Sequence, residues 1–278
     1  MNVELPIQEP IQEPVEKPVE EGVGKGVEAG ATEGKALSPE PNQPDVHSLA
    51  GSPLPNGYLR ALGAVVWKDL AAEFRSRELV SAMLVFSLLV IFIFNFALEL
   101  DATARANVTS GVLWVTFIFA GTLGLNRSMA IEKDRGCLDG LLLAPVDRTV
   151  IYFGKALGNL LFMWLVALIV LPVYSILYNT NLFNLGLILV IMLGSIGYVA
   201  VGTLLASMAV EARTRDMLLP ILLFPVIIPL LVAAVKASSG YLQGLPWDDI
   251  STYVNLLIVY DMIFTAVAYM VFDYVVEE

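Results

Sequence analysis

Six long apolar runs constrain this chain more than any other feature of its sequence. The runs cover residues 79–98, 108–125, 150–177, 185–210, 217–235 and 253–276. A helix needs about 20 residues to cross a hydrocarbon core of about 30 Å, and each run is close to that length or longer. With 57% hydrophobic and only 15% charged residues, the chain is also too apolar for a soluble domain. The sequence predicts an all-α, polytopic membrane protein with six transmembrane helices.

Basic residues gather on one side of these predicted spans. Lysine and arginine number four in 58–78, five in 126–155 and two in 211–216, against one, none and one in the three alternate loops. Basic loops stay in the cytoplasm under the positive-inside rule. Both termini and the 126–155 segment are therefore predicted to be cytoplasmic.

Residues 1–57 differ in composition from the rest of the chain. They hold nine of the fifteen prolines, a repeat that begins PIQEPIQEPVEKPVEE, and ten acidic residues against three lysines. This composition favours an extended, solvated backbone. We predict a disordered tail over 1–57, serving either as a plain linker or as a docking arm, and a membrane domain over 58–278. The net charge of −11 lies mostly in the tail, and we expect no nucleic acid partner.

A short amphipathic segment at 58–78 comes before the first run. Its apolar residues recur at helical spacing, at Leu59, Leu62, Val66, Leu70 and Phe74. The stripe is too narrow to span a bilayer, and Trp67 and the basic residues suit the headgroup level. We predict an interfacial helix here, and the alternative is the water-exposed end of a long first helix.

The segment between the second and third runs is the most charged part of the membrane domain. It reads NRSMAIEKDRGCLDGLLLAPVDRTVIYFGK over 126–155, with charged residues around a short leucine-rich run that Pro145 closes. The pattern is that of a short amphipathic helix stopped by proline, lying on a membrane surface or in a partner's groove. We predict a cytoplasmic coupling loop over 127–149, through which a motor protein grips the membrane domain.

This loop resembles that of the membrane subunits of ABC exporters of type two architecture, E-x-x-x-G-x-L-x-x-L-L-x-x-P followed by R-x-x-x-x-x-G-K. The residues that fit are Glu132, Gly136, Leu138, Leu141, Leu142, Pro145, Arg148, Gly154 and Lys155. Gly140 departs from the pattern, since a longer polar side chain is expected there. The resemblance assigns ATPase coupling to the first seven of these residues.

The fifth run carries Pro220, Pro225 and Pro229. Each proline removes an intrahelical hydrogen bond, so we predict a kinked helix packed against protein, where the freed carbonyls find partners. This series follows a basic loop, and together with RGCLDGLLLAPVDRTVIYFGKALGN it resembles the cytochrome c maturation protein B (CcmB) family over about 60–276. Kinked packing alone would also account for the prolines.

The resemblance implies a non-catalytic membrane subunit of a haem exporter in the bacterial inner membrane. Its implied partners are a second copy of the chain, a separate CcmA-like ATPase, and haem-handling proteins of the CcmC, CcmD and CcmE type. Haem is the implied species that the whole complex transports. The resemblance leaves open whether haem passes through this subunit. The only histidine, His47, lies in the tail, and Cys137 is the only cysteine. We therefore assign no metal site, catalytic group or resident cofactor to the chain.

One acidic residue, Asp261, lies about eight residues into the last run, where a carboxylate is costly unless it faces protein or water. We predict a place at a dimer interface or translocation path, paired with Asn255 or Tyr260, or else a structural, hydrogen-bonded role. Two other functions stay open: a permease for a drug, lipid or polysaccharide, and a membrane scaffold without transport. An intramembrane enzyme is disfavoured, because the sequence offers no serine and histidine pair and no HExxH motif.

Overall fold

The computed structural model describes residues 55–97, 102–134, 148–209 and 215–275, and nearly all of them are helical. The helices are α1 (Pro55–Ser76), α2 (Glu78–Ala97), α3 (Ala102–Asp134), α5 (Arg148–Tyr178), α6 (Leu185–Ala209), α7 (Arg215–Gln243) and α8 (Trp247–Val275). Residues 1–54 of the predicted tail lie outside the described residues. Its last three residues, 55–57, belong to α1.

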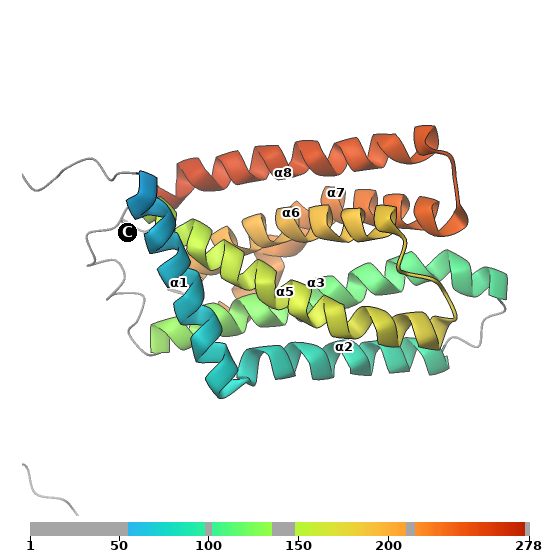
Figure 1. Ribbon diagram of the computed structural model, residues 1–278, viewed down its shortest axis with the longest axis horizontal. Coiled ribbons are helices and arrows are strands. Elements are labelled where there is room, and N and C mark those ends of the chain that lie inside the picture. The colour runs from blue at the N-terminus through green and yellow to red at the C-terminus, as the bar shows by residue number, and fades with distance from the viewer. Residues whose placement is uncertain (1–54, 98–101, 135–147, 210–214, 276–278) are drawn as a thin grey trace, which may run out of the picture. The chain divides into compact units, whose positions relative to one another are not determined.

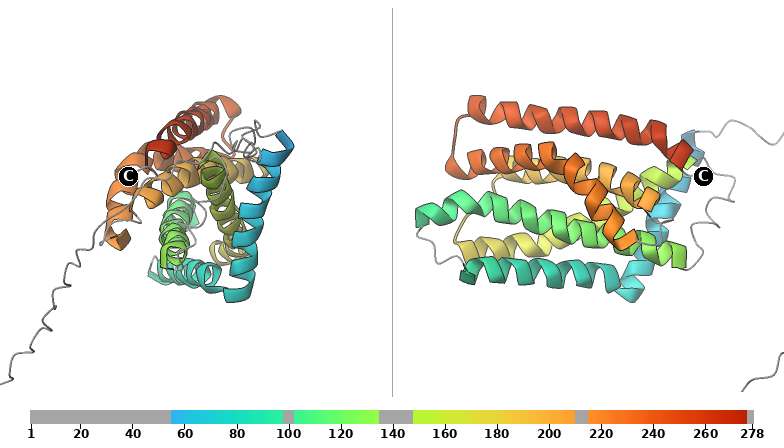
Figure 2. Two further views of the ribbon diagram at one scale, coloured as in Figure 1. Left: turned by 90° about the vertical axis from the view of Figure 1, so that its left-hand side faces the viewer. Right: turned by 180° about the vertical axis from the view of Figure 1, so that it is seen from behind.

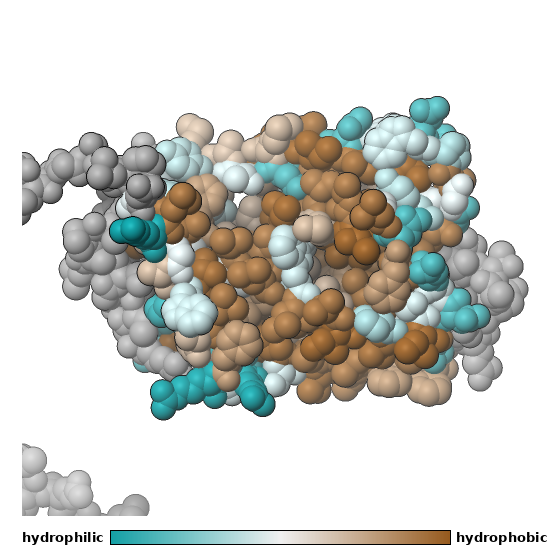
Figure 3. Space-filling model, viewed as in Figure 1, coloured by the Kyte–Doolittle hydropathy of each residue, from teal (hydrophilic) through white to brown (hydrophobic). Residues whose placement is uncertain are grey.

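Six of these helices, all but α1, are long and apolar enough to cross a membrane. They lie side by side along a common direction (Figures 1 and 2). Figure 3 shows a broad hydrophobic band across the middle of one face, with hydrophilic residues toward the two ends of the helices. The predicted all-α polytopic membrane fold with six transmembrane helices is confirmed.

The core between these helices contains aromatic side chains, and several of their polar groups are bonded across helices. The Trp114 indole N–H of α3 donates to the Ser238 hydroxyl of α7 at 2.9 Å, and the Tyr174 hydroxyl of α5 donates to the Thr109 carbonyl at 2.9 Å. Helix α6 packs against α7, α8 and α5, and is largely enclosed. Because lipid offers no partners for polar groups, these bonds let polar side chains sit in the membrane and fix the helix register.

Helix ends differ from those that hydropathy predicted. Helix α3 continues to Asp134, and α7 continues to Gln243, both beyond the apolar runs. Residues 236–251, which lie between the fifth and sixth apolar runs, are also largely helical, since only a short turn at 244–246 separates α7 from α8. A polar side chain at the level of the water ends an apolar run without ending the helix, because the backbone hydrogen bonds continue past it.

Helix α1 lies across one end of the bundle, at the end where α3 finishes and α5 starts (Figure 1). A sharp corner at Arg77, with φ +55°, separates it from α2. The Glu73 carboxylate builds this corner by accepting a hydrogen bond from the Val80 N–H at 2.8 Å, which caps the start of α2. Of the two alternatives for 58–78, the structure has the separate helix.

Helix α7 is bent, as the view from behind in Figure 2 shows. Pro220, Pro225 and Pro229 all lie inside it, so the bend falls in a helix that lacks several backbone donors. The rings of Pro225 and Pro229 are exposed rather than packed against the bundle. The Tyr260 hydroxyl of α8 donates to the Val226 carbonyl at 3.1 Å. The neighbouring carbonyl, that of Pro225, has no intrahelical donor because Pro229 lacks an N–H group.

Candidate functional site

The two described parts of the predicted coupling loop, 127–134 and 148–149, lie at the end of the bundle that α1 crosses (Figure 1). Five of its seven predicted contact residues fall in 135–147, outside the described residues: Gly136, Leu138, Leu141, Leu142 and Pro145. Glu132 lies in the last turn of α3, and Arg148 is the first residue of α5. The first part of the predicted loop, 127–134, is therefore helical.

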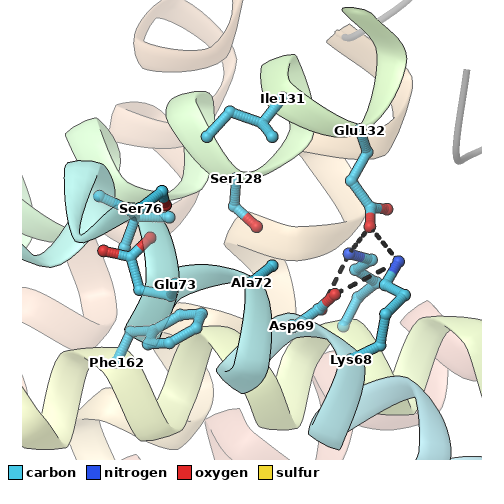
Figure 4. A pocket seen from close by; sticks show the side chains of 11 residues that line it. Lys68, Asp69, Ala72, Glu73, Ser76, Ser128, Ile131, Glu132 and Phe162 are labelled. Atoms are coloured by element: carbon cyan, nitrogen blue, oxygen red, sulfur yellow. Dashed lines mark hydrogen bonds and ion pairs between the residues drawn. The ribbon is translucent and has the colours of Figure 1, made fainter. Parts of the chain in front are cut away.

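Glu132 belongs to a cluster of four charged residues that joins α1, α3 and α5 (Figure 4). Its Oε1 atom contacts the Nζ atom of Lys68 at 2.5 Å and the Nζ atom of Lys155. Asp69 pairs with the same two lysines: its Oδ2 atom lies 2.8 Å from the Nζ atom of Lys155, and its Oδ1 atom lies 3.3 Å from the Nζ atom of Lys68. Each carboxylate thus bridges both lysines, and the two positive and two negative charges balance. We call these four residues the ion-pair cluster.

The ion-pair cluster is shielded from water. The Lys155 side chain is 3% exposed, those of Glu132 and Asp69 are 8% and 11% exposed, and only Lys68 reaches the surface. Burial lowers the pKa of Lys68, but the hydrogen bond and negative charge of Glu132 and the carboxylate of Asp69 outweigh it and raise that pKa above its ordinary value. Lys68 therefore stays protonated, and removing one member leaves a buried charge uncompensated.

The glycine and lysine that end the predicted motif have a structural reason to be adjacent. A Cβ atom at Gly154 would lie 2.7 Å from Cγ1 of Val65 on α1. The bare backbone therefore lets α1 lie directly on α5, and this contact brings Asp69 within reach of Lys155. The pair is a docking point for α1 within the subunit.

A cavity of about 130 Å³ lies beside the ion-pair cluster, between α1, α3 and α5 (Figure 4). Ser128, Ile131 and Phe162 form part of its wall. The second oxygen of Glu132, Oε2, is buried and has no hydrogen-bond partner among the residues that the structure describes. The cavity has room for water beside this polar atom.

Sequence reasoning missed Lys68, Asp69 and Glu73, which it treated as ordinary residues of an amphipathic helix. Lys68 lies 64 residues from its partner Glu132 in the sequence, and Asp69 lies 86 residues from its partner Lys155. One signal was present: Lys155 falls inside the run predicted over 150–177, and an ionisable residue within a membrane helix needs a partner.

Asp261 lies inside the subunit, between α6, α7 and α8. It is 8% exposed, and its carboxyl group lies against Gly197 of α6 and Leu230 of α7. Neither partner suggested by the sequence bonds to it, since Asn255 is exposed and the Tyr260 hydroxyl donates to α7 instead. Both carboxyl oxygens lack a hydrogen-bond partner among the described residues. Helix α8 starts at Trp247, so Asp261 is near its middle rather than about eight residues from its start.

No cluster of three or more histidine, cysteine, aspartate or glutamate side chains is placed to hold a metal within the described ranges. The cluster of two lysines, an aspartate and a glutamate instead has the chemistry of a structural joint. It holds the ends of two helices, on either side of 135–147, to a third helix that lies across them.

The sequence of this chain is similar to those of known proteins. The CcmB protein family matches residues 60–276. Heme exporter protein B of Rhodobacter capsulatus is 26% identical over 183 residues, which are 66% of this chain and 84% of the relative. Heme exporter protein B of Bradyrhizobium diazoefficiens is 25% identical over 187 residues, 67% of this chain and 84% of the relative. The protein of the same name from Escherichia coli K12 is 25% identical over 200 residues, 68% and 87% of the two chains. The chain belongs to the CcmB family.

Proposed function

We propose that this chain is the non-catalytic membrane subunit of a haem exporter of the ABC type in the bacterial inner membrane, and that a separate ATPase drives it through residues 127–149. The match to the CcmB family over 60–276 carries the proposal. The relatives are named heme exporter protein B. The permease would have type two architecture, with both termini and α1 on the cytoplasmic side.

The ion-pair cluster supports the coupling role of the loop. A push on 135–147 acts first on the end of α3 and the start of α5, because these are the helices it connects. Glu132 and Lys155 tie both of these ends to α1 through buried contacts. The three helices therefore move together under load, and the force reaches the bundle as a displacement of helices rather than a local bend of the loop.

Glu132 takes a different part in this scheme from the leucines. It is buried against two lysines of its own subunit, so it anchors the loop and does not meet the ATPase. Contact with the ATPase falls to Leu138, Leu141 and Leu142. Burial of these side chains contributes about 1.5–3 kcal/mol each, before the cost of ordering the loop is subtracted.

The experiment is to replace Leu141 and Leu142 with Asp and to purify the subunit with whatever associates with it. The variant should remain in the membrane and lose the ATPase, because two carboxylates replace the apolar contact. The control is Leu245→Asp, which changes an exposed leucine between α7 and α8, at the other end of the bundle. Retention of the ATPase with normal stimulation in the double variant contradicts the coupling role.

The proposed assembly contains two copies of this chain, two copies of a CcmA-like ATPase, and haem-handling proteins of the CcmC, CcmD and CcmE type. Mass spectrometry of the purified complex tests this composition. Co-purification of haem-handling proteins supports haem export or release of a haem chaperone in cytochrome c maturation. An ATPase without them favours an exporter of drugs, lipids or polysaccharides, and absence of any ATPase favours a scaffold.

A further inference from the structure

An apolar groove of about 320 Å³ runs beside the corner of α1 and α2. Its apolar lining comes from three helices: Leu70 and Phe74 of α1, Val80 and Leu84 of α2, and Phe162 and Leu165 of α5. All of these except Phe162 are half-buried or exposed, so the groove is open on one side. The groove lies beside the first turns of the transmembrane helix α2, next to α1, which crosses the end of the bundle.

The position of the groove determines what can fill it. Helix α2 is the least enclosed of the six spans, with only 22% of its apolar window buried. Its outer face must therefore meet hydrocarbon or another protein. A groove with apolar walls that is open toward the bilayer matches an acyl chain of a lipid in the leaflet on the α1 side.

Arg77 stands at the rim of the groove, where the headgroup of such a lipid would lie. Its side chain is exposed and makes no ion pair with any residue that the structure describes. A guanidinium presents several N–H donors in a plane, which suits the oxygens of a phosphate. The backbone of Arg77 is fixed between two helices, and its N–H donates to the Glu73 carbonyl at 2.6 Å.

The surrounding charge favours a lipid with net negative charge. Outside the ion-pair cluster, the exposed ionic side chains of α1 are arginines, Arg60 and Arg75, and Arg77 follows directly. Glu73 does line the groove, but it is buried and one of its oxygens caps α2 through Val80. Glu78 is paired with Arg127 at 2.6 Å. The patch at headgroup level is thus positive. Figure 3 shows hydrophilic residues at this corner beside the hydrophobic band.

We propose that the groove between α1, α2 and α5 binds an acyl chain of an anionic phospholipid whose phosphate pairs with Arg77. The bound lipid fills the open wall of the corner and fixes the angle between α1 and α2. Since α1 is also tied to α3 and α5 by the ion-pair cluster, the lipid supports the same joint from the membrane side. This inference does not depend on what the protein transports.

The test measures phospholipid retention by the full-length subunit in mild detergent, using native mass spectrometry. Phosphatidylglycerol and phosphatidylcholine with identical acyl chains are added separately, and inorganic phosphate serves as a third probe. We expect phosphatidylglycerol to be retained and to raise the melting temperature, with little effect of the other two. Loss of the arginine–phosphate contact in Arg77→Gln should weaken phosphatidylglycerol binding about tenfold.

Four further variants separate the lipid site from its alternatives. Arg77→Gly removes the same charge but suits the positive φ, so it keeps the test valid if Arg77→Gln folds poorly. Leu84→Trp fills the groove and should also reduce retention. Arg60→Gln removes an exposed arginine of α1 away from the groove and should change nothing. Arg77→Lys should keep most of the binding.

Several outcomes overturn the proposal. Equal retention of the two phospholipids shows that the net charge of the lipid does not matter. If Arg60→Gln weakens binding as much as Arg77→Gln does, the lipid is attracted to α1 in general and not to Arg77. A melting shift with inorganic phosphate alone shows that no acyl chain is needed. Loss of the retained lipid when the whole exporter complex is assembled shows that a second copy or another subunit covers the groove.

Discussion

Individual buried charges decide the stability of the joint at the base of the proposed coupling loop. We predict that Lys155→Met lowers the free energy of unfolding by about 3–5 kcal/mol, because two buried carboxylates then share one lysine. Arg127→Met is the control, since its pair with Glu78 is half exposed and worth about 1 kcal/mol or less. The double variant Glu132→Leu with Lys155→Met should recover part of the loss, because both charges leave together. The readout is the melting temperature in detergent, and equal shifts for Lys155→Met and Arg127→Met contradict the prediction.

A second prediction at the residue scale concerns Gly197, which makes room for Asp261. A Cβ atom at this position would collide with the Asp261 carboxyl group and lie 2.8 Å from Cδ1 of Leu230. Gly197→Ala should therefore cost about 1–3 kcal/mol through overpacking. Asp261→Ala in the same chain should restore part of that stability, since it removes the nearer of the two contacts. Gly63→Ala is the matched control, with no atom within 4 Å of its Cβ position, and it should be neutral or slightly stabilising.

At the scale of elements, the corner between α1 and α2 depends on a side-chain cap rather than on the backbone alone. Glu73→Ala removes the acceptor for the Val80 N–H and should cost about 0.5–2 kcal/mol. The loss should be local, so amide hydrogen exchange should speed up in the first turn of α2 and stay unchanged in the enclosed helix α6. Glu78→Ala, which removes an exposed carboxylate from the same turn, should leave this exchange unchanged. Faster exchange throughout the bundle would show that the corner supports the whole fold.

The elements that were predicted well from the sequence are those that depend only on the residues within each element. Six spans follow from apolar runs of membrane length, because burial in lipid depends on the composition of each segment alone. Helix ends such as Gln243 and Trp247 were missed, because hydropathy reports where lipid ends and not where backbone hydrogen bonding ends. The ion-pair cluster was also missed, because Asp69 meets Lys155 only after α1 folds back across α5. The predicted motif located Glu132 and Lys155 but could not indicate that they bond to each other.

At the scale of the whole molecule, function depends on which side of the membrane the loop occupies. Helix α1, the end of α3, the start of α5 and the end of α8 lie at one end of the bundle in Figure 1. The excess of basic residues in the segments at this end predicts that it faces the cytoplasm. A cytoplasmic ATPase can reach 135–147 only with this orientation, so topology is a test of the proposed coupling.

The single cysteine, Cys137, lies in that loop and reports its side directly. A maleimide that cannot cross membranes should leave Cys137 unlabelled in intact spheroplasts and label it after lysis. Gln243→Cys, made together with Cys137→Ser, places the only thiol at the exposed end of α7, at the opposite end of the bundle. This variant should be labelled in intact spheroplasts, and Cys137→Ser alone should not be labelled at all. The reverse pattern for the two thiols would put the loop outside the cell, where no ATP-driven partner could act on it, and would overturn the coupling proposal while leaving the fold intact.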